Sequence, residues 1–278
     1  MEKYITCWGD SLTAMGEWIG RLSELSGLPA YNAGTGGEST HTITARQGAD
    51  AIILSDVTIP AEPTPVQLAD FDHPFQTYLG NAAFPLLQSG AHVNPVKIGD
   101  VEGTLAFTGV RHDDKTGVWT FTRAQAGEEV VIDRPTALTT DFDRNRNAPY
   151  LMIIFMGQNG GWDMDPQKLI RQHRLMIDHA RAEHVLVLGL SSGTAEGRAA
   201  YERAMKEAFG RYFISLREYL SKYGLADAGI APTEEDLAMM AEGKTPQSLL
   251  IDSVHFKLET RIVIGNLIYK RACELSIF

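Results

Sequence analysis

The chain has 278 residues, of which 44% are hydrophobic and 22% charged, and its formal net charge is −10 at pH 7. This composition is that of an ordinary globular protein, long enough for one large domain or for a domain that carries an insertion. The acidic balance argues against nucleic acids and anionic membranes as partners, because binding them requires clustered Lys and Arg side chains.

The cysteines and the chain start give further expectations. Cys7 and Cys273 lie far apart in the sequence and indicate neither a disulfide framework nor a zinc site. No signal-peptide pattern opens the sequence, and no segment reaches membrane-spanning length. We therefore expect a soluble protein, either cytoplasmic or virion-associated.

The first predicted elements are a strand and a helix with a polar junction between them. Residues 4–8 form an apolar run of strand type, and apolar residues then recur at helical spacings as far as Gly27. The junction reads Gly9-Asp10-Ser11-Leu12. A serine there stands above the carboxyl edge of a sheet, before a helix amino terminus that favours negative charge, so it suits a nucleophile. The same tetrapeptide also fits a simple helix N-cap, because Asp and Ser are both good caps.

A β-rich region is predicted next, after a short extended piece at 30–33 and a glycine-rich turn at 34–37. Between about residues 49 and 148, short segments rich in β-branched and aromatic residues alternate with Gly, Pro and Asp. Such a stretch is too long for an unstructured loop, so it predicts a small antiparallel β-domain inserted into an α/β domain. Its segment His112-Asp113-Asp114 fits a solvated hairpin turn better than a metal site.

Strands and helices alternate again from residue 149 to the end of the chain. Strands are predicted over 150–156, 185–190 and 212–215, and helices behind the cap Asp165, over 199–209, behind the cap Thr233 and over 257–275. This alternation indicates right-handed crossovers and a mostly parallel sheet. The predicted α/β domain thus comprises residues 1–48 and 149–278, with residues 49–148 inserted. Three histidines, His173, His179 and His184, fit surface positions on or beside a helix.

Polar residues follow two strands whose ends would meet at one crevice. Open α/β sheets bind ligands outside the carboxyl ends of their strands, where the strand order reverses. In a flavodoxin-like order this point lies between the first and third strands, which here end at Ser11 and Asn159. Near the carboxyl terminus, Asp252 could hold one nitrogen of His255 while the other accepts the Ser11 proton. The alternative is that Asp252 caps the last helix and His255 is a surface residue of its first turn.

Acyl transfer also needs donors aimed at the oxygen that becomes negative, each worth roughly 3 kcal/mol of barrier. The candidates are the backbone N–H groups of Ser11 and Gly37 and the side-chain amide of Asn159. The alternatives are a turn that needs positive φ at Gly37 and a simple turn residue at Asn159. Asp10 and Trp162 are candidates for a substrate pocket, although Trp162 equally fits core packing.

Four segments of the chain together resemble the sequence blocks of the SGNH (GDSL) hydrolase family, in the family's order. They are Gly9-Asp10-Ser11-Leu12, residues 32–40, Gly157-Gln158-Asn159 and Asp252-Ser253-Val254-His255. The resemblance covers about residues 1–48 and 149–278. Two positions depart from the family pattern, because Gly160 stands where Asp usually follows the Asn, and Phe256 where Pro often follows the His. Neither departure removes a catalytic group, but Gly160 could loosen the loop that presents Asn159.

The resemblance implies a three-layer α/β/α fold with a flavodoxin-like parallel sheet, and ester hydrolysis through an acyl-enzyme without a metal or other cofactor. The family roles would fall on Ser11 as nucleophile, His255 as base, Asp252 as the residue that orients it, and Gly37 and Asn159 as oxyanion donors. The inserted β-domain lies outside the common family core.

The leading hypothesis is a serine esterase that removes acetyl or another short acyl group from a carbohydrate, with the inserted domain narrowing the crevice or gripping a glycan. One alternative keeps the chemistry and changes the substrate to a lipid, as in a lysophospholipase, or to a thioester. Another alternative is a non-catalytic glycan-binding or structural module, motivated by Gly160 and the large insertion. In each case the expected partner is a small molecule or glycan, and the oligomeric state stays open.

Overall fold

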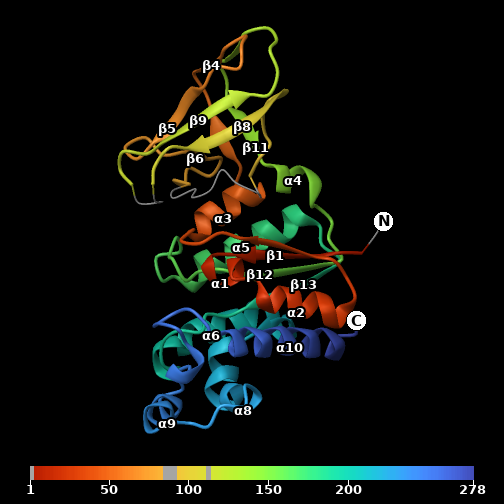
Figure 1. The fold of residues 1–278 in the computed structure, drawn as a ribbon, viewed down its shortest axis with the longest axis vertical. Helices are drawn as coiled ribbons and strands as arrows, with labels where there is room; N and C mark the ends of the chain where they lie inside the picture. Colours follow the sequence, from red (N-terminus) through yellow and green to blue (C-terminus); the bar gives the residue numbers. More distant parts are fainter. Residues whose placement is uncertain (1–2, 84–92, 111–113) are drawn as a thin grey trace.

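A five-stranded parallel sheet forms the centre of the α/β part of the molecule (Figure 1). The computed structural model describes residues 3–83, 93–110 and 114–278. The strands lie in the order β14-β13-β12-β1-β2, which is the 2-1-3-4-5 order of a flavodoxin-like sheet when they are numbered along the chain. Their bounds are β1 (Ile5–Gly9), β2 (Ala30–Gly34), β12 (Leu151–Phe155), β13 (His184–Leu188) and β14 (Phe213–Ile214). The predicted mixed α/β fold with a parallel sheet is confirmed.

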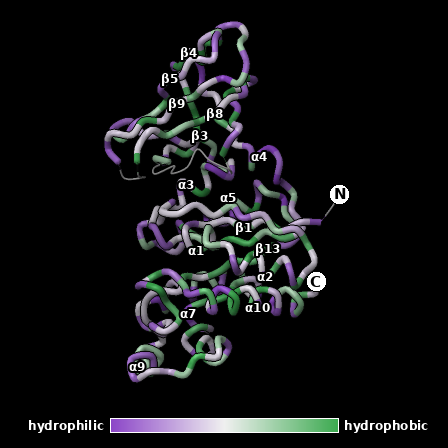
Figure 2. The backbone as a smooth tube through the Cα atoms, in the orientation of Figure 1, coloured by the Kyte–Doolittle hydropathy of each residue, from purple (hydrophilic) through white to green (hydrophobic). Residues whose placement is uncertain are grey.

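Helices cover both faces of this sheet. Ile5 and Cys7 of β1 pack with α2 (Glu17–Ser26) and α10 (Leu258–Glu274) on one face. Trp8 of β1 packs on the opposite face. The helices on that face are α3 (Thr40–Gln47), α5 (Pro166–Ala180) and α6 (Ala195–Phe209). Burial from both sides explains the continuous apolar runs of β12 and β13, and β13 is hydrophobic along most of its length (Figure 2).

An antiparallel sheet lies beyond α3, on the side away from the parallel sheet (Figure 1). In the chain, its strands come between β2 and β12 of the parallel sheet. Its strand order is β5-β9-β8-β7-β11-β3-β6, and a separate pair joins β10 to β4. The bounds are β3 (Ile52–Leu54), β4 (Val57–Ile59), β5 (Val66–Asp70), β6 (Gln76–Thr77), β7 (Val96–Ile98), β8 (Val101–Phe107), β9 (Val118–Arg123), β10 (Val130–Ile132) and β11 (Thr136–Thr139). This sheet has its own core, in which Leu105, Trp119 and Phe121 are buried. The short helix α4 (Asp141–Asn145) leads the chain back to β12.

The first helix differs from its prediction. The continuous apolar pattern predicts one helix, but the structure has a single turn, α1 (Ser11–Ala14), followed by α2. Gly16 separates the two helices with a left-handed φ of 79°, a conformation that favours glycine. Ser11 is therefore carried by a separate short turn, which the Trp18 indole N–H of α2 joins through the Leu12 carbonyl at 3.0 Å.

The region after β14 is also more broken than expected. A π-helix, η2 (Leu220–Gly224), lies between the one-turn helices α7 (Leu216–Tyr219) and α8 (Leu225–Asp227). Short 3-10 turns occur at η1 (Gly210–Tyr212) and η3 (Gln247–Leu249). The predicted capping box is present, since Thr233 and Asp236 cap α9 (Glu234–Ala241) reciprocally. Within the described ranges, no helix is both long and apolar enough to cross a bilayer.

Candidate active site

Three consecutive residues at the end of β1 have three different structural tasks. A Cβ on Gly9 would lie 2.1 Å from the Phe155 carbonyl oxygen, so only glycine fits between the strands there. Asp10 is the N-cap of α1, and its carboxylate accepts the Leu12 N–H at 3.0 Å. Ser11 follows as the first residue of the turn. The expected helix cap is therefore present at Asp10, and Ser11 stands at the start of the helix.

Ser11, His255 and Asp252 form one hydrogen-bonded series. His255 Nε2 lies 2.9 Å from Ser11 Oγ, and His255 Nδ1 lies 2.8 Å from Asp252 Oδ2. The side chains of His255 and Asp252 are 32% and 54% exposed, so the series is open to a ligand from solvent. The structure brings these three predicted residues together from the start of α1 and from a loop about 240 residues later in the chain.

The Asp252 carboxylate is held by the loop that carries His255. Its Oδ1 accepts the backbone N–H groups of Val254 and His255, each at 2.8 Å. The backbone bond from His255, the ring bond from His255 and the Val254 bond hold the pKa of Asp252 at about 2. An ionised Asp252 favours the tautomer with hydrogen on Nδ1, which leaves the Nε2 lone pair facing the Ser11 hydroxyl.

The alternative of Asp252 as a cap for α10 is wrong. That helix begins at Leu258 with Lys257 as its N-cap, beyond the His255 loop. The loop is closed instead by an Ile251 N–H bond to the His255 carbonyl at 2.7 Å. Phe256, the residue after His255, is fully buried in the core. It stands where the SGNH sequence pattern often has Pro.

The glycine turn lies against Ser11. A Cβ built on Gly36 would stand 3.8 Å from the Ser11 Cβ, and the Thr35 N–H donates to the Gly9 carbonyl at 3.1 Å. Gly37 has a left-handed φ of 77°. The expected positive φ at Gly37 is therefore present, and the same turn lies beside Ser11.

The loop of Asn159 is tied to the same turn. Asn159 Nδ2 donates to the Glu38 carbonyl at 3.2 Å, and the Thr40 N–H donates to the Gly160 carbonyl at 3.1 Å. The Asn159 amide carries a second N–H that this bond does not use. Gly160, which departs from the family pattern, adopts a left-handed φ of 78° in this tied loop.

The expected substrate-pocket residues have other surroundings. Asp10 is 1% exposed, and burial raises the pKa of its carboxyl to about 6. Trp162 is 2% exposed, donates its indole N–H to the Gly157 carbonyl at 2.8 Å and packs near Tyr201. Both side chains are enclosed, so we correct the expectation that they line an open pocket.

The histidines outside the series do not assemble a metal site in the described part of the chain. No group of three or more His, Cys, Asp or Glu residues that could hold a metal occurs there. His112 and Asp113 lie outside the described residues. His173, expected at the surface, is buried against Phe209, because its spacing from Leu169 and Met176 places it on the buried stripe of α5.

Two cavities bear on where a ligand could lie. One, of about 180 Å³, borders the loop of Asp252 and His255. It is lined by Ser191, Ser192, Gly193, Met239, Lys244, Thr245, Gln247, Leu250, Ser253 and Val254. Ser192 also links it to the Asn159 loop, because its hydroxyl lies 3.3 Å from Gln158 Oε1. This cavity therefore borders the loop of Asp252 and His255 directly, and the Asn159 loop only through Ser192.

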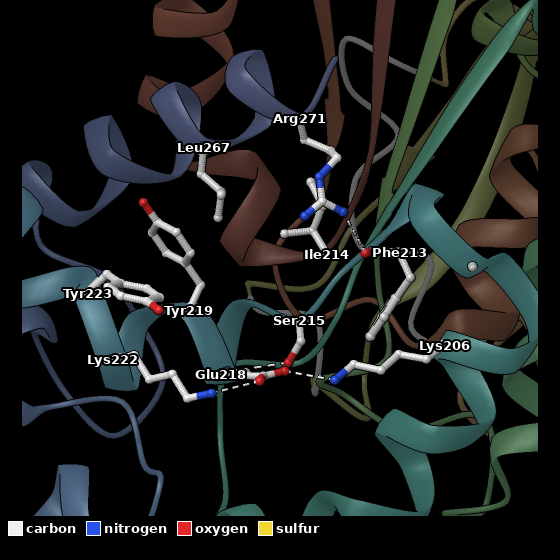
Figure 3. Close-up of a pocket in the computed structure, with 11 residues that line it drawn as sticks. Lys206, Phe213, Ile214, Ser215, Glu218, Tyr219, Lys222, Tyr223, Leu267 and Arg271 are labelled. Carbon is white, nitrogen blue, oxygen red and sulfur yellow. Dashed lines mark hydrogen bonds and ion pairs between the residues drawn. The ribbon is translucent and has the colours of Figure 1, made fainter. Parts of the chain in front are cut away.

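The other cavity, of about 500 Å³, lies at the β14 edge of the sheet and contains none of the candidate site residues (Figure 3). Lys206 and Lys222 both donate to Glu218 across its floor, at 2.7 and 2.8 Å. Arg271 donates to the Phe213 carbonyl of the edge strand at 3.4 Å. Its charged groups are thus engaged with one another or with the backbone.

Comparison with known proteins adds little. No protein-family model matches the chain, and no curated protein matches it. A solved structure described as "Peptidoglycan O-acetylesterase in action, 5 min" is similar over 99% of this chain and 91% of its own, with 12% identity and a TM-score of 0.39. A likeness at this level supports no conclusion about fold or function, so these rest on the geometry above.

Proposed function

We propose that the protein is a serine ester hydrolase of SGNH type. The observation that carries this proposal is the hydrogen-bonded series from Ser11 Oγ through His255 to Asp252. In the proposed reaction, His255 Nε2 accepts the Ser11 proton as Oγ attacks the ester carbonyl, and Asp252 stabilises the imidazolium that forms. His255 then gives the proton to the leaving alcohol, and a water activated in the same way releases the acid from Ser11.

The proposed oxyanion donors are the N–H groups of Ser11 and Gly37 and the free N–H of the Asn159 amide. Two contacts support this choice: the glycine turn lies against Ser11, and Asn159 is bonded to that same turn. Donors held by backbone contacts are preorganised, so they stabilise the developing negative charge without reorganising during the reaction.

We further propose that the substrate is a short-acyl ester of a carbohydrate, such as an O-acetyl sugar. The cavity bordered by Ser253 and Val254 is smaller than the roughly 300–1,000 Å³ of drug-sized sites, which suits one sugar ring better than a long acyl chain. Its lining combines hydroxyl and amide groups, such as Ser253 and Gln247, with the apolar Leu250 and Val254. Such a surface can both bond sugar hydroxyls and cover the apolar face of a ring.

The experiment is hydrolysis of p-nitrophenyl acetate by the wild type, by Ser11→Ala and by Ser26→Ala. Ser11→Ala should lose at least about 10⁴-fold in kcat/KM, because it removes the nucleophile. Ser26 is the last residue of α2 and belongs neither to the hydrogen-bonded series nor to the cavity lining, so Ser26→Ala is the matched control. Full activity in a folded Ser11→Ala variant would overturn the mechanism, and a preference for twelve-carbon over two-carbon acyl chains would overturn the substrate class.

A further inference from the structure

A buried ion pair lies directly behind the glycine turn. The side chains of Glu38 and Arg46 are both 0% exposed. Arg46 Nε donates to the two Glu38 carboxylate oxygens at 3.1 and 2.9 Å, and Arg46 Nη2 lies 2.8 Å from Oε2. Glu38 is the residue after Gly37, and Arg46 stands in the last turn of α3. The pair therefore joins the turn to the far end of the helix that follows it.

The same two residues also bind the backbone around the site. Arg46 Nη2 donates to the Ala33 carbonyl at 2.8 Å, next to the end of β2. The Arg46 guanidinium lies over the Trp8 ring of β1, 5.2 Å from its centroid. The Glu38 carbonyl accepts the Asn159 amide. Of the three proposed oxyanion donors, Gly37 thus adjoins Glu38 in the chain and Asn159 is hydrogen-bonded to it.

Stability alone is a weak reason for such a pair. Replacing a buried ion pair by apolar residues of similar volume is often neutral or stabilising, because desolvating both charges offsets their attraction. Here Arg46 Nη1 finds no hydrogen-bond acceptor within the described ranges, which adds to the desolvation penalty. The pair instead fixes geometry, because the planar Arg46 guanidinium binds both the Glu38 carboxylate and the Ala33 carbonyl and so holds the backbone on both sides of the glycine turn.

We propose that the Glu38–Arg46 pair positions the oxyanion donors Gly37 and Asn159, so that losing it lowers kcat and leaves KM nearly unchanged. The inference rests on the proposed esterase function. The two residues touch no substrate, and they act through the turn and through the Asn159 amide. Donors misplaced by about 1 Å lose much of their effect on the transition state, while ground-state binding in the crevice is unaffected.

A second buried pair in the chain provides the matched control. Arg217 Nε and Nη2 donate to Glu202 at 2.8 and 2.7 Å, and both residues are less than a tenth exposed. This pair joins α6 to α7, and Glu202 also binds Ser215, which lines the cavity of Figure 3. Among the described residues it makes no hydrogen bond or ion pair with the proposed oxyanion donors. Its removal should destabilise the fold in a comparable way without moving the oxyanion donors.

The test compares Arg46→Met, the double variant Glu38→Leu/Arg46→Met, and the corresponding Arg217→Met and Glu202→Leu/Arg217→Met. Each is assayed with p-nitrophenyl acetate at a temperature where circular dichroism shows it folded. We expect kcat to fall by about 10- to 100-fold in both Arg46 variants, with KM within about twofold of the wild type. The double variant should recover thermal stability but not kcat, whereas the Arg217 variants should keep kcat.

Three results separate the possible failures. If wild-type kcat persists in the folded Arg46 variants, or if the Arg217 variants lose as much kcat, the positioning role is wrong and the esterase proposal stands. If the double variant recovers kcat together with stability, the pair is merely structural. If the wild type hydrolyses no ester, the proposed function fails, and this inference fails with it.

Discussion

Gly34, at the end of β2, offers a sharp test of how Ser11 is presented. A Cβ on Gly34 would lie 2.2 Å from the Ala14 backbone nitrogen, 2.6 Å from the Thr13 carbonyl carbon and 2.8 Å from the Ala14 Cα. All three atoms belong to the backbone of α1, so no side chain can rotate away. Gly34 does not adopt a left-handed φ, so the contact itself is the obstacle to alanine.

Gly34→Ala should therefore push α1 away from β2 by about 1 Å, which overpacking data put at roughly 1–3 kcal/mol of lost stability. Because α1 begins at Ser11, the same shift moves the proposed nucleophile relative to His255, and a 1 Å error in position can cost about 100-fold in rate. Thermal unfolding and kcat/KM for p-nitrophenyl acetate measure the two effects separately.

The control is Gly20→Ala, the same substitution in the interior of α2. A Cβ there meets nothing within 4 Å, so the variant should gain about 0.5–1 kcal/mol from better helix propensity and keep full activity. Wild-type stability and activity in Gly34→Ala would refute the argument that the close approach of β2 fixes Ser11.

Three further predictions concern ionisable groups. Because burial raises the pKa of Asp10 to about 6, its ionisation destabilises the fold increasingly as the pH rises from about 4 to 6, by up to about 3 kcal/mol. Asp10→Asn should thus gain stability against the wild type in urea unfolding at pH 7 but not at pH 4, and an equal difference at both pH values would contradict this. Burial lowers the pKa of His173 to about 4, so the fold loses up to about 3 kcal/mol as the pH falls from 6.5 to 4. His173→Phe should flatten that part of the pH-stability profile, and an unchanged acid slope would count against it. Asp252→Asn should lower kcat by about 10⁴-fold with the fold intact, because it favours the wrong tautomer of His255, and a loss below tenfold would exclude that role.

The sequence predicts those parts of the fold that depend on neighbouring residues, such as apolar runs and helix caps. The central strands β12 and β13 are apolar runs of strand length, and the caps Asp165 and Thr233 mark helix starts that the structure contains. The candidate site is predictable for a related reason. Ser11 and Asn159 lie in the loops after two strands that end at the same edge of the sheet, as the paired register of Gly9 and Phe155 shows.

The helix α3 shows what local patterns miss. Its sequence is polar and has no apolar stripe, so no helix is predicted there, yet seven of its eight residues are buried. The cause is tertiary, because α3 lies between two sheets: Ile43 packs toward the parallel sheet and Ala45 joins the core of the antiparallel sheet. The Thr44 hydroxyl donates to the Thr40 carbonyl at 2.7 Å, which lowers the cost of burying this polar side chain. The Glu38–Arg46 pair escapes prediction for the same reason, since nothing in the sequence indicates that this helix is covered on both sides.

The position of α3 also bears on the role of the antiparallel sheet. Arg46 reaches the glycine turn through Glu38, and its carbonyl accepts the Thr140 hydroxyl at 2.8 Å. Thr140 directly follows β11 and caps α4, so it stands where the chain leaves the antiparallel sheet. A displacement of that sheet relative to the parallel sheet would therefore act on Arg46, and through Arg46 on the turn beside Ser11. Two hydrogen bonds, from Thr140 to Arg46 and from Arg46 to Glu38, thus connect the end of the antiparallel sheet with the glycine turn.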